Sequence, residues 1–111
     1  MRRWNGWGDE ANHYPMPDGG HAFLESQIGP GHILSDARLE DVLAQVPASR
    51  LKAHELIDTS KEVRVRHARG QSLPDWLAMR SGRFEVFPDG VAFPKTAQEI
   101  RELMRFAQAH D

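Results

Sequence analysis

The C-terminal part of the sequence constrains the fold more than any other part. Residues 90–93 (GVAF) predict a short buried strand that ends at Pro94. Thr96 and Glu99 follow with the spacing of a capping box, in which each side chain binds the backbone N–H of the other residue, so a helix is predicted to begin there. The next apolar residues recur at helical spacing and form one stripe: Ile100, Leu103, Met104 and Ala107.

A strand and helix of this kind form half of a βα unit. The apolar stripe of the helix must be buried on a sheet, and one short strand is not a sheet. The usual continuation is a second, parallel strand reached by a right-handed crossover. We therefore expect a truncated chain of the α+β class. In this division, residues 1–87 form a mostly helical and irregular N-terminal region, and residues 88–111 form the first βα unit of a further domain.

The N-terminal region has less regular patterning. Residues 1–34 are rich in glycine and proline, which predicts turns and loops, and a loop of this length is expected to lie along a surface supplied by another part of a protein. Residues 48–61 are ambiguous between irregular structure and a short helical turn. Residues 62–66 (EVRVR) alternate like a strand but are too few to decide.

Two helices are predicted in the middle of the chain. The first begins after Ser35 and ends at Pro47, with apolar residues at i, i+3, i+4 and i+7 between them. The second begins at a capping box of Ser72 and Asp75 and ends before Gly82. Two of its residues are expected to face inward: Trp76 and Leu77.

Composition excludes several classes of function. Sixteen acidic residues against fourteen Lys and Arg give a formal charge of −2, so neither nucleic acid nor an anionic membrane is an expected partner. The chain has no cysteine, which excludes disulfides and thiolate metal sites and makes a reducing, cytoplasmic compartment the expectation. No apolar run approaches the roughly 20 residues of a membrane span, and the N-terminal sequence is not that of a secretory signal.

Two blocks of the sequence resemble a known enzyme family. Residues 2–9, within RRWNGWGDE, and residues 62–96 are similar to alkyldihydroxyacetonephosphate synthases (alkylglycerone-phosphate synthases) and their bacterial FAD-linked oxidase relatives. The resemblance implies a parent of the vanillyl-alcohol-oxidase-like group, with a PCMH-type FAD-binding domain of which residues 88–111 are the start. In such a parent the flavin ring acts as the electron sink, either in an oxidase or in a synthase.

The resemblance also implies what this chain lacks. In the family, the helix ending near Ala109 is followed by a strand and a Gly-rich turn that holds the FAD diphosphate. We therefore expect the 111-residue chain alone to be inert and not to retain FAD, with no catalytic residue of its own. The implied partners are the remainder of the FAD-binding and substrate domains, and the implied substrate is a small molecule, either a lipid ether precursor or a 2-hydroxy acid.

Three residues are candidate binding residues on this resemblance. His67 and Arg69 are candidates for a substrate phosphate or carboxylate, although a structural hydrogen bond is the favoured alternative for His67. Pro94 is a candidate for the adenine side of FAD, although simple termination of the strand is preferred. Several arginines accompany them and are interpreted as an ion-paired surface: Arg64, Arg66, Arg69, Arg80 and Arg83.

The remaining polar and aromatic candidates have simpler interpretations. Trp4 and Trp7 are either a ligand-stacking pair or, as favoured, anchors of an irregular segment on a core. No metal site is predicted, because the histidines fit no metal-binding spacing: His13, His21, His32, His54, His67 and His110. A different class of function is also open: a self-contained, small helical interaction module whose C-terminal helix docks on a partner.

Overall fold

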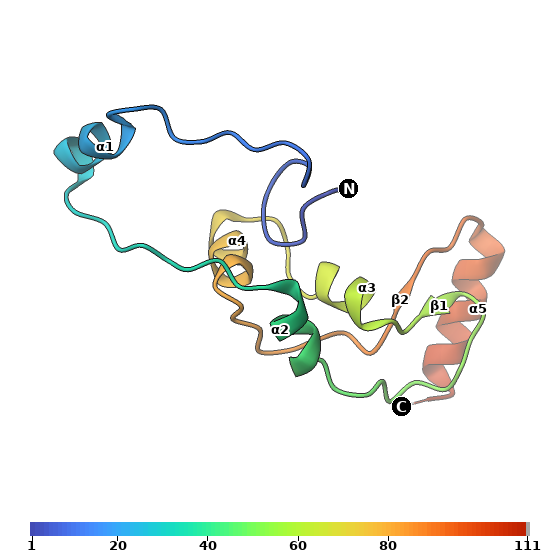
Figure 1. Cartoon of the computed structure of the whole chain (residues 1–111). Coiled ribbons are helices and arrows are strands. Elements are labelled where there is room, and N and C mark those ends of the chain that lie inside the picture. Colours follow the sequence, from blue (N-terminus) through green and yellow to red (C-terminus); the bar gives the residue numbers. More distant parts are fainter. Residues whose placement is uncertain (111) are drawn as a thin grey trace.

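The computed structural model describes residues 1–110 and is of the α+β class, as predicted. Five helices and a two-stranded sheet follow one another along the chain: α1 (Gly20–Ile28), α2 (Leu39–Gln45), β1 (Ile57–Asp58), α3 (Lys61–Arg66), α4 (Leu73–Arg80), β2 (Val91–Ala92) and α5 (Ala97–Gln108). The molecule is elongated, with extents of 57 × 27 × 24 Å. In Figure 1, α1 lies at one end of the molecule, joined to the rest by long loops, and α5 lies beside the two strands at the opposite end.

The hydrophobic core is small and lies where the N-terminal segment, α2 and α3 meet. Trp4, Val42, Val46 and Val65 form it, and the side chains of Val42 and Val65 are completely buried. The stacked rings of Phe84 and Phe87, 5.2 Å apart, pack against this cluster.

Helix α4 begins and ends as the sequence predicts. The hydroxyl of Ser72 accepts the backbone N–H of Asp75, and the carboxylate of Asp75 accepts the backbone N–H of Ser72. Gly82, just beyond the helix, has a φ of +71°, a conformation that side chains with a Cβ rarely adopt. The prediction for Trp76 is confirmed, but Leu77 is exposed. Met79, three residues after Trp76, shares the inward face instead.

Helix α5 also forms at the predicted residues, with the predicted capping box of Thr96 and Glu99. None of its residues is buried, and its apolar stripe is largely uncovered: Ile100 is 50% and Met104 is 61% exposed. The helix contacts the rest of the described chain through a different side, where the ring of Phe106 packs edge-on against His54.

The buried strand predicted at residues 90–93 forms at Val91–Ala92, where both residues are half-buried, and it has a partner that the sequence did not identify. β2 pairs antiparallel with β1, with Ile57 opposite Ala92 and Asp58 opposite Val91. Gly90 permits this approach, because a Cβ at that position would lie 2.5 Å from the side chain of Ile57. The strand is therefore part of a sheet within this chain, built with a segment about 30 residues upstream.

Three local features differ from the sequence-based expectations. Residues 62–66 lie in helix α3, and the adjacent residues Arg64 and Val65 are both buried, which a half-exposed strand would not allow. Helix α1 forms within the loop-rich region, although none of its residues is buried. Helix α2 begins at Leu39 and not after Ser35, and the intervening residues Asp36 and Ala37 form hydrogen bonds with Arg80 of α4. No helix in the described part of the chain is long and apolar enough to cross a membrane.

Arg64 is the one buried charged residue among the described residues, with 1% of its surface exposed. Its Nε donates to the carbonyl of Pro88 at 2.6 Å, and its Nη1 donates to the carbonyl of Pro47 at 2.8 Å. The interpretation of Arg64 as part of a surface cluster was therefore wrong. This side chain joins the end of α2 and the approach to β2 to helix α3.

The first prediction concerns this buried arginine. Arg64→Met keeps the apolar stem but removes both charge-assisted hydrogen bonds to the carbonyls of Pro47 and Pro88, so we expect it to lower the free energy of unfolding by about 3 kcal/mol. Urea unfolding followed by circular dichroism measures this change. Arg83→Met, at an exposed arginine, is the control and should stay within about 0.5 kcal/mol of the unsubstituted protein. Equal losses in the two variants would contradict the structural role of Arg64.

The second prediction concerns the Asp36–Arg80 ion pair between α4 and the segment before α2. The hydrogen bond from Arg80 lowers the pKa of Asp36 below its ordinary value of 3.8. The stabilisation is therefore complete above pH 3.8 and is lost as the pH falls through the lowered pKa. Asp36→Asn should reduce the melting temperature at neutral pH, and the difference should disappear in strong acid. A difference that persists there would show that the ion pair is not its cause.

Candidate functional site

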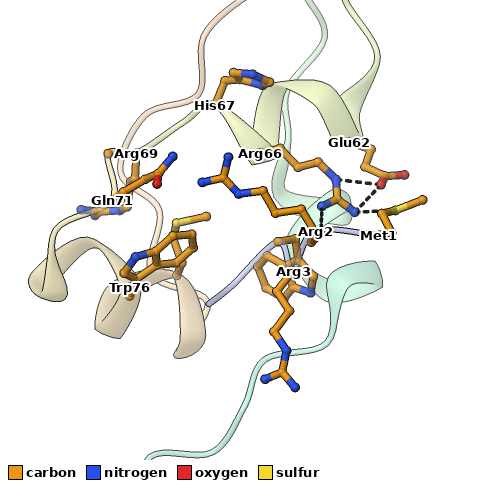
Figure 2. Close-up of a pocket in the computed structure, with 12 residues that line it drawn as sticks. Met1, Arg2, Arg3, Glu62, Arg66, His67, Arg69, Gln71 and Trp76 are labelled. Atoms are coloured by element: carbon orange, nitrogen blue, oxygen red, sulfur yellow. Dashed lines mark hydrogen bonds and ion pairs between the residues drawn. The ribbon is translucent and has the colours of Figure 1, made fainter. Parts of the chain in front are cut away.

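A half-open cavity of about 530 Å³ lies between the N-terminal segment, α3 and α4. Figure 2 shows side chains from all three elements converging on it. An antiparallel β-bridge between Arg2 and Asp9 closes the first residues of the chain into a compact turn, which lies beside the cavity. Trp4 then enters the core beside the cavity.

Arg66 forms one wall of the cavity and fixes the N-terminal segment to α3. Its Nε and Nη2 donate to Glu62 at 2.9 and 2.8 Å, and its Nη1 donates to the backbone carbonyl of Arg2 at 2.8 Å. Glu10 lies 3.6 Å from the same guanidinium. Two carboxylates therefore balance the charge of Arg66, and its donors are engaged within the protein.

His67 and Arg69, the two residues predicted to bind substrate, both line this cavity. The Nδ1 of His67 lies 2.8 Å from the carbonyl of Val63, so the structural hydrogen bond considered as the alternative is present. Arg69 donates through Nε to the carbonyl of Arg83 at 3.2 Å. Its Nη1 lies 3.8 Å from Asp75, whose pKa is lowered mainly by hydrogen bonds from Ser72 and to a smaller extent by Arg69. A substrate-binding role for the pair stays a prediction.

Pro94, the predicted cofactor-binding residue, lies elsewhere. It is exposed between β2 and α5 and does not line the cavity. Next to it, the carboxylate of Glu99 accepts the backbone N–H groups of Lys95 and Thr96. These hydrogen bonds lower the pKa of Glu99, so a negative charge occupies the N-terminus of α5 at neutral pH.

Among the cavity residues that sequence reasoning did not assign to a site are Arg2, Gln71 and Trp76. In Figure 2 the side chain of Arg2 extends across the cavity toward Gln71 and Trp76. Trp76 is 7% exposed, and its indole N–H has no acceptor among residues 1–110. No pattern in the sequence connects residue 2 with residues 71 and 76, so only the folded chain brings them together.

The tryptophan and arginine interpretations are confirmed in part. Trp4 anchors the N-terminal segment in the core, whereas Trp7 is 62% exposed and only contacts Trp76 edge-on at 6.1 Å. The interpretation as ion pairs holds for three of the arginines: Arg66, Arg69 and Arg80. Within the described residues, no three His, Asp or Glu side chains are grouped so as to hold a metal ion.

Comparison with known proteins gives distant matches. No protein-family model matches the chain, and no solved structure matches it. Alkyldihydroxyacetonephosphate synthase of Caenorhabditis elegans is 24% identical in an alignment of 137 residues that covers 98% of this chain and 23% of the synthase. Protein Rv2250A of Mycobacterium tuberculosis is 28% identical over 106 residues, which cover 83% of this chain and 68% of that protein. The chain thus spans about a quarter of the nematode synthase and is distantly related to it.

Proposed function

We propose that this chain forms the N-terminal part of a FAD-dependent enzyme of the FAD-linked oxidase type, similar to alkyldihydroxyacetonephosphate synthase. Its role there is to pack on the catalytic body, and the residues that perform the chemistry belong to the rest of the enzyme. The distant relation to the nematode synthase, which extends over 98% of the chain, supports the enzyme class.

The exposed surface is the observation that carries the packing role. A compact folded protein of this mass exposes about 6,200 Å², whereas this chain exposes 8597 Å². The excess is roughly 2,400 Å², which is comparable to the area of a permanent protein–protein interface. The radius of gyration agrees, because 18.4 Å is well above the ~13 Å of a compact domain of about 100 residues. The chain is therefore suited to lie against a larger body.

The apolar residues on this surface indicate where such a body would lie. The stripe of α5 is one region, with Ile100 and Met104 at its centre. Helix α1 is a second region, because Phe23 and Ile28 are 65% and 82% exposed. These two helices stand at opposite ends of the molecule in Figure 1, so the proposed body extends along its whole length.

The N-terminus of α5, in the predicted βα unit, does not fit the phosphates of FAD. A diphosphate needs free backbone N–H groups at a helix N-terminus or a glycine-rich turn. At α5 the carboxylate of Glu99 accepts the backbone N–H groups of Lys95 and Thr96 just before the helix, and its negative charge would repel a phosphate. In the proposed enzyme, the flavin supplies the redox chemistry and is held by residues outside this chain.

One observation favours a second arrangement, in which the flavin-binding body is a separate polypeptide. The match to Protein Rv2250A covers 68% of that protein, so most of it consists of sequence related to this chain. The chain would then act as the interaction module considered above, and α5 would dock on the separate flavoprotein.

The DNA downstream of the Asp111 codon distinguishes these arrangements. An open frame that encodes a strand and then a Gly-rich turn supports one continuous flavoenzyme. A stop codon supports the two-chain arrangement, which then requires a flavin-containing protein to co-purify with the chain from its native host. An open frame that continues into a domain without flavin, or a co-purifying partner without flavin, overturns the proposal.

The third prediction concerns flavin retention. The 111-residue chain should emerge from gel filtration without FAD, because the N-terminus of α5 is occupied by its own capping carboxylate. The absorbance spectrum of the purified protein measures this. Stoichiometric yellow flavin on the chain alone would contradict the assignment of the flavin site to another part of the enzyme.

The fourth prediction concerns the stripe of α5. The double variant Ile100→Asp, Met104→Asp should keep the helix content but weaken association with the flavin-binding body at least about tenfold, since each apolar side chain contributes on the order of 1.5–3 kcal/mol when buried. Gel filtration of the mixture and circular dichroism measure the two effects. The matched control is Gln98→Asp, Gln108→Asp, two exposed positions outside the stripe. Equal binding by both double variants would exclude the stripe as the interface.

A further inference from the structure

The cavity beside α3 and α4 contains hydrogen-bond donors that the protein itself does not use. The indole N–H of Trp76 is buried and has no acceptor within the described residues. Buried donors are nearly always paired in folded proteins, so this one needs an explanation. Arg2 and Gln71 are exposed residues that line the same cavity, and their side chains form no hydrogen bond or ion pair with residues 1–110. All three groups are donors, although the Gln71 amide also carries an acceptor oxygen.

Two arginines that line the cavity form no ion pair with a carboxylate of residues 1–110: Arg3, whose guanidinium donates to the carbonyls of Asp9 and Asn12, and Arg2. Glu62 and Glu10 balance Arg66, and Asp75 stands 3.8 Å from Arg69. The pKa of Asp75 is lowered mainly by its hydrogen bonds with Ser72, so this carboxylate is ionised and engaged at neutral pH. Arg2 therefore contributes an uncompensated positive charge, and its guanidinium extends into the cavity (Figure 2).

We propose that this cavity binds an oxyanion, the carboxylate or phosphate group of a small ligand, between the guanidinium of Arg2, the amide of Gln71 and the indole N–H of Trp76. A guanidinium binds either group through two parallel hydrogen bonds. The cavity of about 530 Å³ is larger than such a group alone and has the size of a small-molecule site. Its remaining walls include the apolar side chains of Met79 and Trp4, which suit the uncharged part of the ligand.

The structure also separates this site from the ion pairs beside it. Arg66 is unsuited as a ligand residue, because its guanidinium already binds Glu62 and the carbonyl of Arg2. The hydrogen bond from Arg66 to the carbonyl of Arg2 fixes the backbone at residue 2, from which the Arg2 side chain enters the cavity. The site does not depend on the proposed relation to flavoenzymes, since every group in it belongs to this chain.

The indole N–H of Trp76 provides a direct readout of the proposed site. In nitrogen-15 correlation spectra of the full chain, Trp76→Phe identifies its resonance among those of the three tryptophans. Inorganic phosphate and sodium acetate are the probes, each titrated into the millimolar range at constant ionic strength with chloride as the balancing anion. We expect a saturable downfield shift of the Trp76 resonance with at least one probe, and the probe that acts identifies the oxyanion.

Three variants test the assignment. Arg2→Gln should weaken binding at least about tenfold, because a charge-assisted contact is removed. Gln71→Leu should weaken it in the same direction. Arg38→Gln, at an exposed arginine outside the cavity, is the matched control and should bind as the unsubstituted protein does. The Trp4 resonance reports whether each variant keeps its core.

Three outcomes would overturn the proposal: no saturable shift with either probe, the same shift with chloride alone, or equal affinity in Arg2→Gln and Arg38→Gln. None of them would bear on the flavoenzyme relation, which is tested by flavin content and the downstream reading frame.

Discussion

The buried guanidinium of Arg64 is the interaction on which the rest of the structure depends. The hydrophobic core cluster contains four buried residues and is too small to position three chain segments by itself. Arg64 joins these segments by donating to the carbonyls of Pro47 and Pro88 from the centre of α3. Pro47 follows the end of α2 and Pro88 precedes β2, so their carbonyls lie outside the helix and the strand and are available to a side-chain donor. The neighbouring Asp89 extends this connection, since it binds Arg50 at the start of the segment that leads to β1.

The sequence predicted the features whose causes are local. Both capping boxes lie within four consecutive residues, so helices α4 and α5 were found at their observed starting points. The pairing of β1 with β2 depends on residues more than 30 positions apart and on the absence of a side chain at Gly90, and no local pattern shows this. Residues 62–66 alternate like a strand, but burial of Arg64 and Val65 side by side makes them helical. The tertiary contacts decided the structure at this position, against the weak local pattern.

The candidate site also contains residues that the sequence predicted and residues that only the structure identified. His67 and Arg69 are close in sequence, and both line the cavity. Arg2, Gln71 and Trp76 come from segments that are nearly 70 residues apart, and they meet because Arg66 binds the backbone of the N-terminal segment. Arg66 of α3 looks most suited to bind an anion by its position, but it is a structural residue. Arg2, a side chain with no evident role in the sequence, lines the cavity and forms neither a side-chain hydrogen bond nor an ion pair with residues 1–110.

The uncovered stripe of α5 follows from how this helix is held. The capping box fixes its N-terminus, and the edge-on contact between Phe106 and His54 fixes its orientation about its own axis. With Phe106 turned toward the body, Ile100 and Met104 must lie on another side, because they are offset from Phe106 around the helix by the 3.6-residue period. Rotating the helix to bury the stripe would remove the aromatic contact and displace β2, which precedes the helix by only a few residues. The exposed stripe is therefore a consequence of the chain's own packing, and this geometry leaves it available to a second surface.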